Sequence, residues 1–193
     1  MKQTFYIFIF ILTQTLTFGQ INSTVSNIFY NLPLDKSRAD LREIIASDKR
    51  FVSTDTVSNI MKFTMPYFLG TIKETSIVKS NPDSTEIHLS FGSSTFSRTK
   101  GGEKDFIPIM FLSLKYYYSN IDSVKVEYDK LLKLLQVELK ESSDTKMEST
   151  QSQFKAIGKL FENFNPYYSV EVLSASVTNN VYGLYIEFRR EEK

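Results

Sequence analysis

The chain contains no cysteine, no tryptophan and a single histidine, His88, and these absences exclude several kinds of site. Without cysteine there is no disulfide, no thiol nucleophile and no lipid anchor on an N-terminal cysteine. Zinc sites draw mainly on cysteine and histidine, so a metal site here would need carboxylates instead. A serine hydrolase would have to use His88 as its base, and no GxSxG motif surrounds any serine. We therefore predict neither catalytic residues nor a metal or cofactor.

The N-terminal sequence MKQTFYIFIFILTQTLTFGQ has the pattern of a bacterial secretory signal peptide. One basic residue, Lys2, precedes an unbroken apolar run over residues 5–12. This run is too short for a membrane-spanning helix, which needs about 20 mostly apolar residues. Thr17 and Gly19 are small residues suited to a cleavage site, so residues 1–19 form the signal peptide and the cut falls between Gly19 and Gln20. A buried N-terminal strand is the alternative, and export predicts a periplasmic or secreted protein.

The charge balance argues against a nucleic-acid partner. Removing the 19-residue leader from 193 residues leaves 174, with 22 basic and 22 acidic side chains. Nucleic-acid binders usually carry a basic excess, and docking to anionic lipid needs one too. The segment FGSSTFSRTKGGEK, residues 91–104, lacks the GxxxxGK[ST] spacing of a phosphate-binding loop and is predicted to be a hairpin loop. We also expect no stable membrane insertion once the signal is removed.

We predict a single α+β domain over residues 35–193, after a polar lead-in at residues 20–34. Three segments have the apolar spacing of amphipathic helices. They are residues 36–47, with Ser37 as N-cap, residues 122–139 and residues 154–164. Residues 141–153 contain one apolar side chain and are predicted to be a flexible loop or an exposed helical extension.

Strand-like patterns occur in residues 67–78, 84–96, 106–118, 167–177 and 181–190. Residues 106–118 are apolar on both sides, which indicates a central strand. In the last strand Tyr185, Glu187 and Arg189 share the polar side, and Asn179-Asn180 before it favour a hairpin turn. The expected order is helix, three strands, two helices, two strands. That order predicts an antiparallel sheet of about five strands with two to three helices on one face.

The motifs MPYF (65–68) and NPYY (165–168) both precede a predicted hairpin and hint at a duplicated helix-plus-hairpin unit. The layout resembles small envelope proteins of the β-lactamase-inhibitor-protein type or of the outer-membrane-assembly-subunit type. This resemblance concerns the fold alone and transfers no functional residue.

The candidate contact surface is aromatic and consists of Tyr116, Tyr117, Tyr118 and Phe96. Successive residues of a strand point to opposite sides, so at least one of the three tyrosines faces away from the core. Aromatic side chains on an open sheet face anchor protein partners, although ordinary packing is the alternative. His88 lies between two inward-pointing residues and is predicted to be an outward-facing surface histidine.

These patterns favour an exported, non-catalytic domain that binds another envelope protein. Two alternatives stay open. A carboxylate-dependent hydrolase of cell-wall or glycan substrates would need two acidic residues in a concave site. A carrier of a small apolar ligand would need an enclosed cavity of about 300 Å³ or more.

Overall fold

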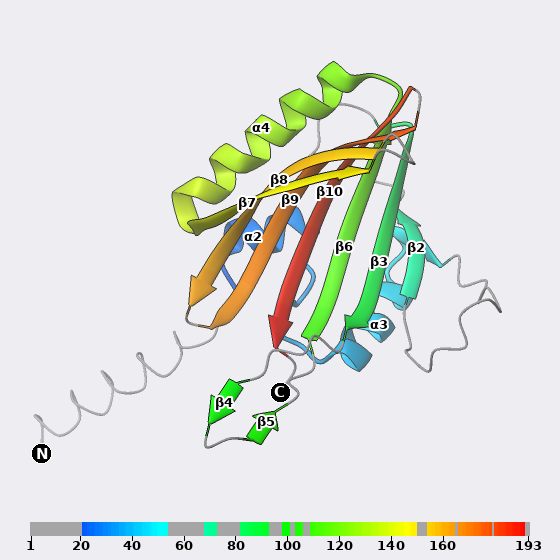
Figure 1. Ribbon diagram of the computed structural model, residues 1–193. Helices are drawn as coiled ribbons and strands as arrows, with labels where there is room; N and C mark the ends of the chain where they lie inside the picture. Colours follow the sequence, from blue (N-terminus) through cyan, green and yellow to red (C-terminus); the bar gives the residue numbers. More distant parts are fainter. Residues whose placement is uncertain are drawn as a thin grey trace, which may run out of the picture.

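The computed structural model describes residues 21–53, 68–72, 82–92, 98–100, 103–105, 109–149, 154–164, 166–178 and 180–191. These residues form an eight-stranded antiparallel sheet, a separate two-stranded hairpin and three helices (Figure 1). The helices are α2 (Ser23–Ile28), α3 (Arg38–Ser47) and α4 (Ile121–Glu138). The strands of the large sheet are β1 (Phe51–Ser53), β2 (Phe68–Ile72), β3 (Ser84–Gly92), β6 (Ile109–Tyr118), β7 (Lys140–Ser149), β8 (Phe154–Phe164), β9 (Tyr167–Thr178) and β10 (Val181–Glu191), and the hairpin comprises β4 (Arg98–Lys100) and β5 (Glu103–Asp105). The protein is therefore α+β, with more strands than the five predicted.

The sheet is built from two meanders of four strands that meet in its middle. The strand order is β1-β2-β3-β6-β10-β9-β8-β7, so the last strand of each meander pairs with the other at β6–β10. Helix α3 leads into the first meander and α4 into the second. A helix followed by a four-stranded meander thus occurs twice, but the two short motifs do not stand at equivalent places in the two meanders. Phe68 begins the second strand of its meander, whereas Tyr167 begins the third.

Two segments of the second meander differ from the sequence prediction. Residues 154–164 form strand β8 instead of a helix, and Phe161 and Phe164 point to opposite sides of the sheet, buried and 62% exposed respectively. Residues 141–149 of the predicted loop belong to strand β7, and residues 150–153 lie outside the described part. β7 is an edge strand that pairs only with β8 among the described strands. Its charged and polar composition suits an edge that must not recruit further strands.

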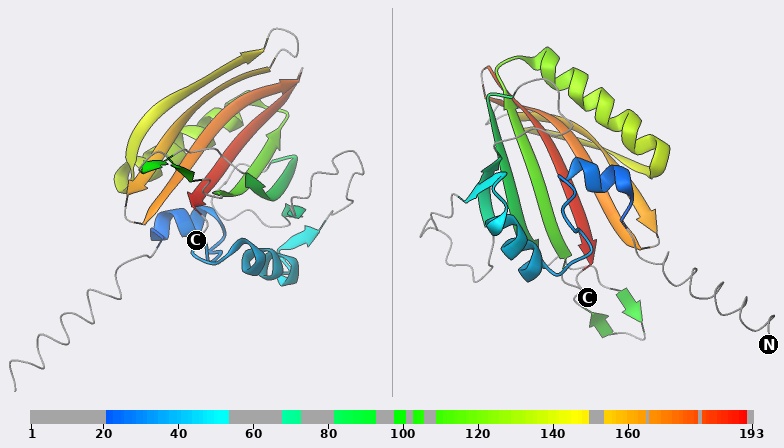
Figure 2. Two further views of the ribbon diagram at one scale, coloured as in Figure 1. Left: turned by 60° about the horizontal axis from the view of Figure 1, so that its bottom comes forward. Right: turned by 180° about the vertical axis from the view of Figure 1, so that it is seen from behind.

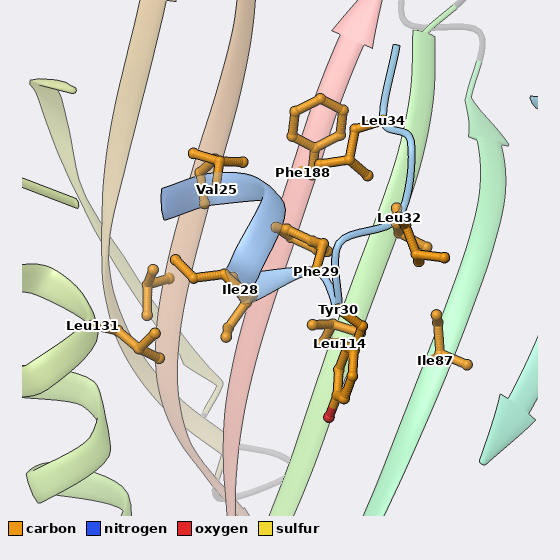
Figure 3. Close-up of a cluster of buried hydrophobic side chains, with 14 of the residues drawn as sticks. Val25, Ile28, Phe29, Tyr30, Leu32, Leu34, Ile87, Leu114, Leu131 and Phe188 are labelled. Atoms are coloured by element: carbon orange, nitrogen blue, oxygen red, sulfur yellow. The ribbon is translucent and has the colours of Figure 1, made fainter. Parts of the chain in front are cut away.

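The predicted polar lead-in is a structural part of the core. Asn22 caps α2, because its side-chain oxygen accepts a hydrogen bond from the backbone N–H of Thr24 at 2.8 Å. Figure 3 shows the segment lying against the sheet, with Phe29 beside Phe188. Six of its side chains are at most 2% exposed: Val25, Ile28, Phe29, Tyr30, Leu32 and Leu34.

The chain turns sharply after α2 in a conformation that a bulky residue rarely adopts. Tyr30 and Asn31 have φ angles of 58° and 56°. Asparagine tolerates this left-handed region, but a tyrosine needs compensating contacts. The Tyr30 hydroxyl lies 3.2 Å from that of Tyr116, and its carbonyl accepts a hydrogen bond from Arg50 at 2.8 Å. Its ring also packs edge-on against Phe51, so the turn is fixed at three points.

All three helices lie on the same side of the sheet, which we call the helix face. In the right-hand view of Figure 2 they stand in front of the strands. Helix α4 packs against β9, β10, β6 and β8 and buries one apolar stripe, as its periodicity predicts. None of the helices formed by the described residues is both long and apolar enough to cross a membrane. No described helix covers the opposite side, which we call the open face and which Figure 1 shows toward the viewer.

Replacing a core side chain of the N-terminal segment should destabilise the protein strongly. Phe29→Ala removes a fully buried ring, and the free energy of unfolding should fall by about 3–5 kcal/mol. Val126→Ala, at a 60% exposed position on α4, is the control and should change it by less than about 0.5 kcal/mol. Urea denaturation of the chain beginning at Gln20 measures both. Equal, small effects would contradict the placement of residues 21–34 in the core.

Candidate functional site

The three consecutive tyrosines of β6 divide between the two faces of the sheet. Tyr116 and Tyr118 are 1% and 3% exposed and belong to the core beneath the helices. Tyr117 points to the open face, as alternation along the strand requires. Burial does not fit a contact role for Tyr116 or Tyr118, so we retain only Tyr117 as a contact candidate. Phe96 lies outside the described residues.

Tyr117 belongs to a pair of rings on the open face. It packs edge-on against Tyr185 of β10, with ring centroids 6.0 Å apart. Tyr185 lies over Gly183, where an added Cβ would come within 2.6 Å of the ring. Glycine at that position therefore allows the tyrosine to lie flat on the sheet. The ammonium of Lys115 sits 6.0 Å from the Tyr185 centroid, in the range of a cation–π contact.

His88 joins this group through a shared carboxylate. Its Nε2 lies 2.9 Å from Oε2 of Glu86, and the Tyr117 hydroxyl donates to the same oxygen at 3.4 Å. The outward direction predicted for His88 is confirmed, although its side chain is only 22% exposed. Burial lowers the pKa of His88, the hydrogen bond to Glu86 opposes this shift, and the charge of Lys115 adds to it.

An ion network occupies the middle of the open face. Arg189 of β10 bonds to both Glu187 and Glu171 through its guanidinium, which also lies 5.8 Å from the Phe111 ring centroid. Burial alone would lower the pKa of Arg189, but the charges of Glu187 and Glu171 outweigh it and raise the pKa. The hydroxyl of Ser113 also donates a hydrogen bond to the Glu187 carboxylate at 3.0 Å.

The network reaches the edge strand through Glu171, which is 5% exposed. The hydroxyl of Thr145 on β7 donates to the Glu171 carboxylate at 2.7 Å. The strand between them, β8, has Gly158 opposite Thr145 and so presents no side chain of its own at that point. Side chains from β6, β10, β9 and β7 are thus connected by hydrogen bonds across one face.

This arrangement does not resemble a hydrolytic centre. Glu171 and Glu187 are direct cross-strand partners, but the guanidinium of Arg189 occupies the space between their carboxylates. A glycosidase pair needs that space for substrate and water. Ser113 donates to Glu187, and His88 bonds to Glu86, so the two do not form a nucleophile–base pair through these bonds. Among the described residues no cluster of three or more metal-ligating side chains occurs.

A depression of about 370 Å³ lies elsewhere, at the start of α3. Its lining consists of Lys36, Asp40, Glu43 and Ile44. Three charged side chains of four make it a poor fit for an apolar ligand, so it gives no support to the carrier alternative.

The sequence predicted which way some side chains of the open face point, but not which of them contact one another. Alternation had already placed Tyr185, Glu187 and Arg189 on one side of their strand. The pairing of β10 with β6 and β9 then brings in Phe111, Ser113 and Glu171. A pattern within one strand does not reveal which strand lies beside it, so these contacts carried no usable sequence signal.

Removing the cation of the ion network should be costly because Glu171 is buried. Arg189→Met should lower the free energy of unfolding at pH 7 by about 2–3 kcal/mol, less than for a fully buried pair because the Arg189 side chain is 35% exposed. Lys125→Met, in an exposed pair with Asp122, should cost about 0.5 kcal/mol or less. Adding Glu171→Gln should recover part of the Arg189→Met loss. Denaturation curves showing equal losses for the two single variants would contradict a buried network.

The only histidine provides a direct probe of the open face. Because its pKa is lowered, the NMR titration midpoint of His88 should lie below 6.5. Glu86→Gln should lower the midpoint further, and Lys115→Met should raise it. The unfolded chain binds this proton more tightly, so the contribution of His88 to stability is present above pH 6.5 and is lost as the pH falls through the folded pKa. A wild-type midpoint at or above 6.5 would contradict the packing described for His88.

Comparisons with known proteins offer no relative from which a role could be transferred. No protein-family model, no curated protein and no solved structure matches this chain. The sequence and the geometry of the open face are therefore the observations from which a function can be proposed.

Proposed function

We propose that this protein is an exported binding protein that holds a protein partner on the open face of its sheet, outside the cytosol. The observation that carries this proposal is the interlocking of the open-face side chains. Tyr117, Glu86 and His88 are joined to one another, and Arg189 is joined to residues on three strands. Side chains that are already ordered lose less conformational entropy when a partner binds.

The residue types on this face suit a protein interface. Tyrosine and arginine dominate the binding energy of measured interfaces, and phenylalanine is enriched there. Tyr117 contacts Tyr185, and Arg189 contacts Phe111, so two such pairs lie on β6 and β10. An open antiparallel face with alternating charges alone would need no such pairs.

The open face is also large enough. Strands of about 10 residues, such as β6, extend about 34 Å, and five strands side by side span about 24 Å. The product, about 800 Å², equals the area that each partner contributes to a standard protein interface.

The predicted signal cleavage is compatible with the contacts that Asn22 makes. The backbone N–H of Asn22 donates to the Tyr168 hydroxyl at 3.3 Å, and its side-chain amide donates to Glu138 at 3.0 Å. A cut between Gly19 and Gln20 leaves these contacts and the whole of α2 in the mature chain. Signal removal at the predicted site is therefore compatible with the folded domain.

Site-specific photocrosslinking in the native host tests the binding function. Tyr117→p-benzoylphenylalanine places a photoreactive ring on the open face, and illumination should yield a discrete adduct of higher mass. The same substitution at Val126 or Val137, which are 60% and 81% exposed on α4, serves as the matched control and should yield none. Mass spectrometry of the same protein should give a chain that begins at Gln20. Adducts formed only from the α4 positions would refute the proposal.

A further inference from the structure

His88 belongs to a group of open-face side chains that share one carboxylate. Oε2 of Glu86 lies 2.9 Å from Nε2 of His88 and accepts a hydrogen bond from the Tyr117 hydroxyl at 3.4 Å. An ionised carboxylate only accepts hydrogen bonds, so Nε2 carries the hydrogen and Nδ1 is the nitrogen that a second proton would occupy. His88 can therefore take up a proton without losing its bond to Glu86.

The charges that face His88 cancel while its ring is neutral. Glu86 lies on the same strand, and Lys115 of β6 stands directly opposite Glu86. On the other side of β3, the described residues of β2 include no titratable side chain. One carboxylate and one ammonium group thus balance each other. Protonation of His88 would leave this group with one unbalanced positive charge.

The strand opposite His88 supplies no further counter-charge. Ser113 of β6 is its direct cross-strand partner, and the Ser113 hydroxyl donates to Glu187. The Glu187 carboxylate is in turn bound by the guanidinium of Arg189. This second carboxylate is therefore committed to the ion network, and Glu86 is the acid on which a protonated His88 would depend.

Protonation would also weaken the bond that orders Tyr117. A bond from an imidazolium to a carboxylate is charge-assisted and strong, whereas the Tyr117 bond of 3.4 Å is already long. The Tyr117 hydroxyl does not ionise in response, because burial and the charge of Glu86 raise its pKa far above the usual range. Glu86 would thus be drawn toward His88 and away from the ring that meets the partner.

A partner on the open face would cover this group. Five long strands form the face, from β3 at one side to β8 at the other. A partner that covers about 800 Å² reaches both Tyr167 of β9, which is 44% exposed, and His88 of β3, whose side chain keeps 22% of its surface exposed. Removing the remaining water makes an unbalanced charge more costly, so a covered His88 favours its neutral form.

We infer that the open face binds its partner more tightly while His88 is neutral than after His88 has taken up a proton. This inference rests on the proposed function and specifies how binding at that face is regulated. Burial already lowers the pKa of His88 in the free protein, and a covering partner lowers it further. The affinity is then complete above the pKa of the free protein and falls as the pH drops below it.

Affinity measured against pH tests the inference, with the protein recovered in the Tyr117 adduct as the probe. Purified mature protein should bind it about threefold to tenfold more weakly at pH 5 than at pH 7.5, because each unit of pKa lowered on binding is worth a factor of ten. His88→Gln keeps a neutral donor beside Glu86 and should lose this pH dependence. Lys115→Met removes a repelling charge, so the midpoint of the affinity loss should move to higher pH. Lys125→Met on α4 makes the same charge change and should leave the midpoint in place.

Three results would overturn the inference. They are equal pH dependence in the wild type and in His88→Gln, tighter binding in acid, and a midpoint that Lys115→Met does not raise. Circular dichroism at each pH separates weaker binding from unfolding. The proposed function would survive all three, since the partner would still be held on the open face. Crosslinks from α4 alone, or no adduct from Tyr117 at any pH, would remove the binding function and this inference with it.

Discussion

The pairing of β6 with β10 determines which side chains lie on the helix face of the sheet and which lie on the open face. The two strands run antiparallel over ten residue pairs, from Tyr118 opposite Tyr182 to Ile109 opposite Glu191. Because side chains alternate along a strand, this register sends Leu114 and Ile186 under the helices and Ser113 and Glu187 to the open face. A shift by one residue would exchange the two faces. The core and the candidate site are therefore consequences of the same pairing.

The two faces are held together by different physical means. On the helix face, residues 21–34 and the apolar stripe of α4 fill the space above the sheet with buried side chains. On the open face, hydrogen bonds and ring contacts order the side chains without any described helix above them. Glu171 is buried there only because Arg189 and Thr145 satisfy its carboxylate. An ordered but uncovered surface is what a binding protein requires, and this links the fold to the proposed function.

Sequence patterns predicted several elements correctly, each for its own reason. The regular spacing of its apolar residues gave α3 with Ser37 as its cap, and apolar residues on both sides gave the central strand β6. The asparagines between two strand-like segments gave the final hairpin β9–β10. The sequence pattern failed for β8, whose Phe161 and Phe164 have helical spacing by coincidence and lie on opposite sides of the sheet. It also failed for β7, since an edge strand is polar by necessity.

The N-terminal segment escaped prediction for a different reason. Helix α2 spans six residues, too few for a periodic signal, and its burial depends on elements more than 100 residues away. The open face shows the same limit. Tyr117 could be predicted from alternation, but its contact with Glu86 joins residues 31 positions apart and depends on which strands are neighbours. Alternation within a strand thus predicts the side of the sheet to which a side chain points. Its contacts depend on which strands are neighbours in the folded sheet.

The central claim is that the open face, and not the helix face, meets the partner. Hydroxyl-radical footprinting followed by mass spectrometry tests it most directly, comparing the purified mature protein with the same protein in its native extracytoplasmic extract. Oxidation of Tyr117, Tyr167 and Tyr185 should decrease in the extract, while that of Val126 and Val137 on α4 should not change. Protection of α4 with unchanged oxidation of the three tyrosines would contradict it.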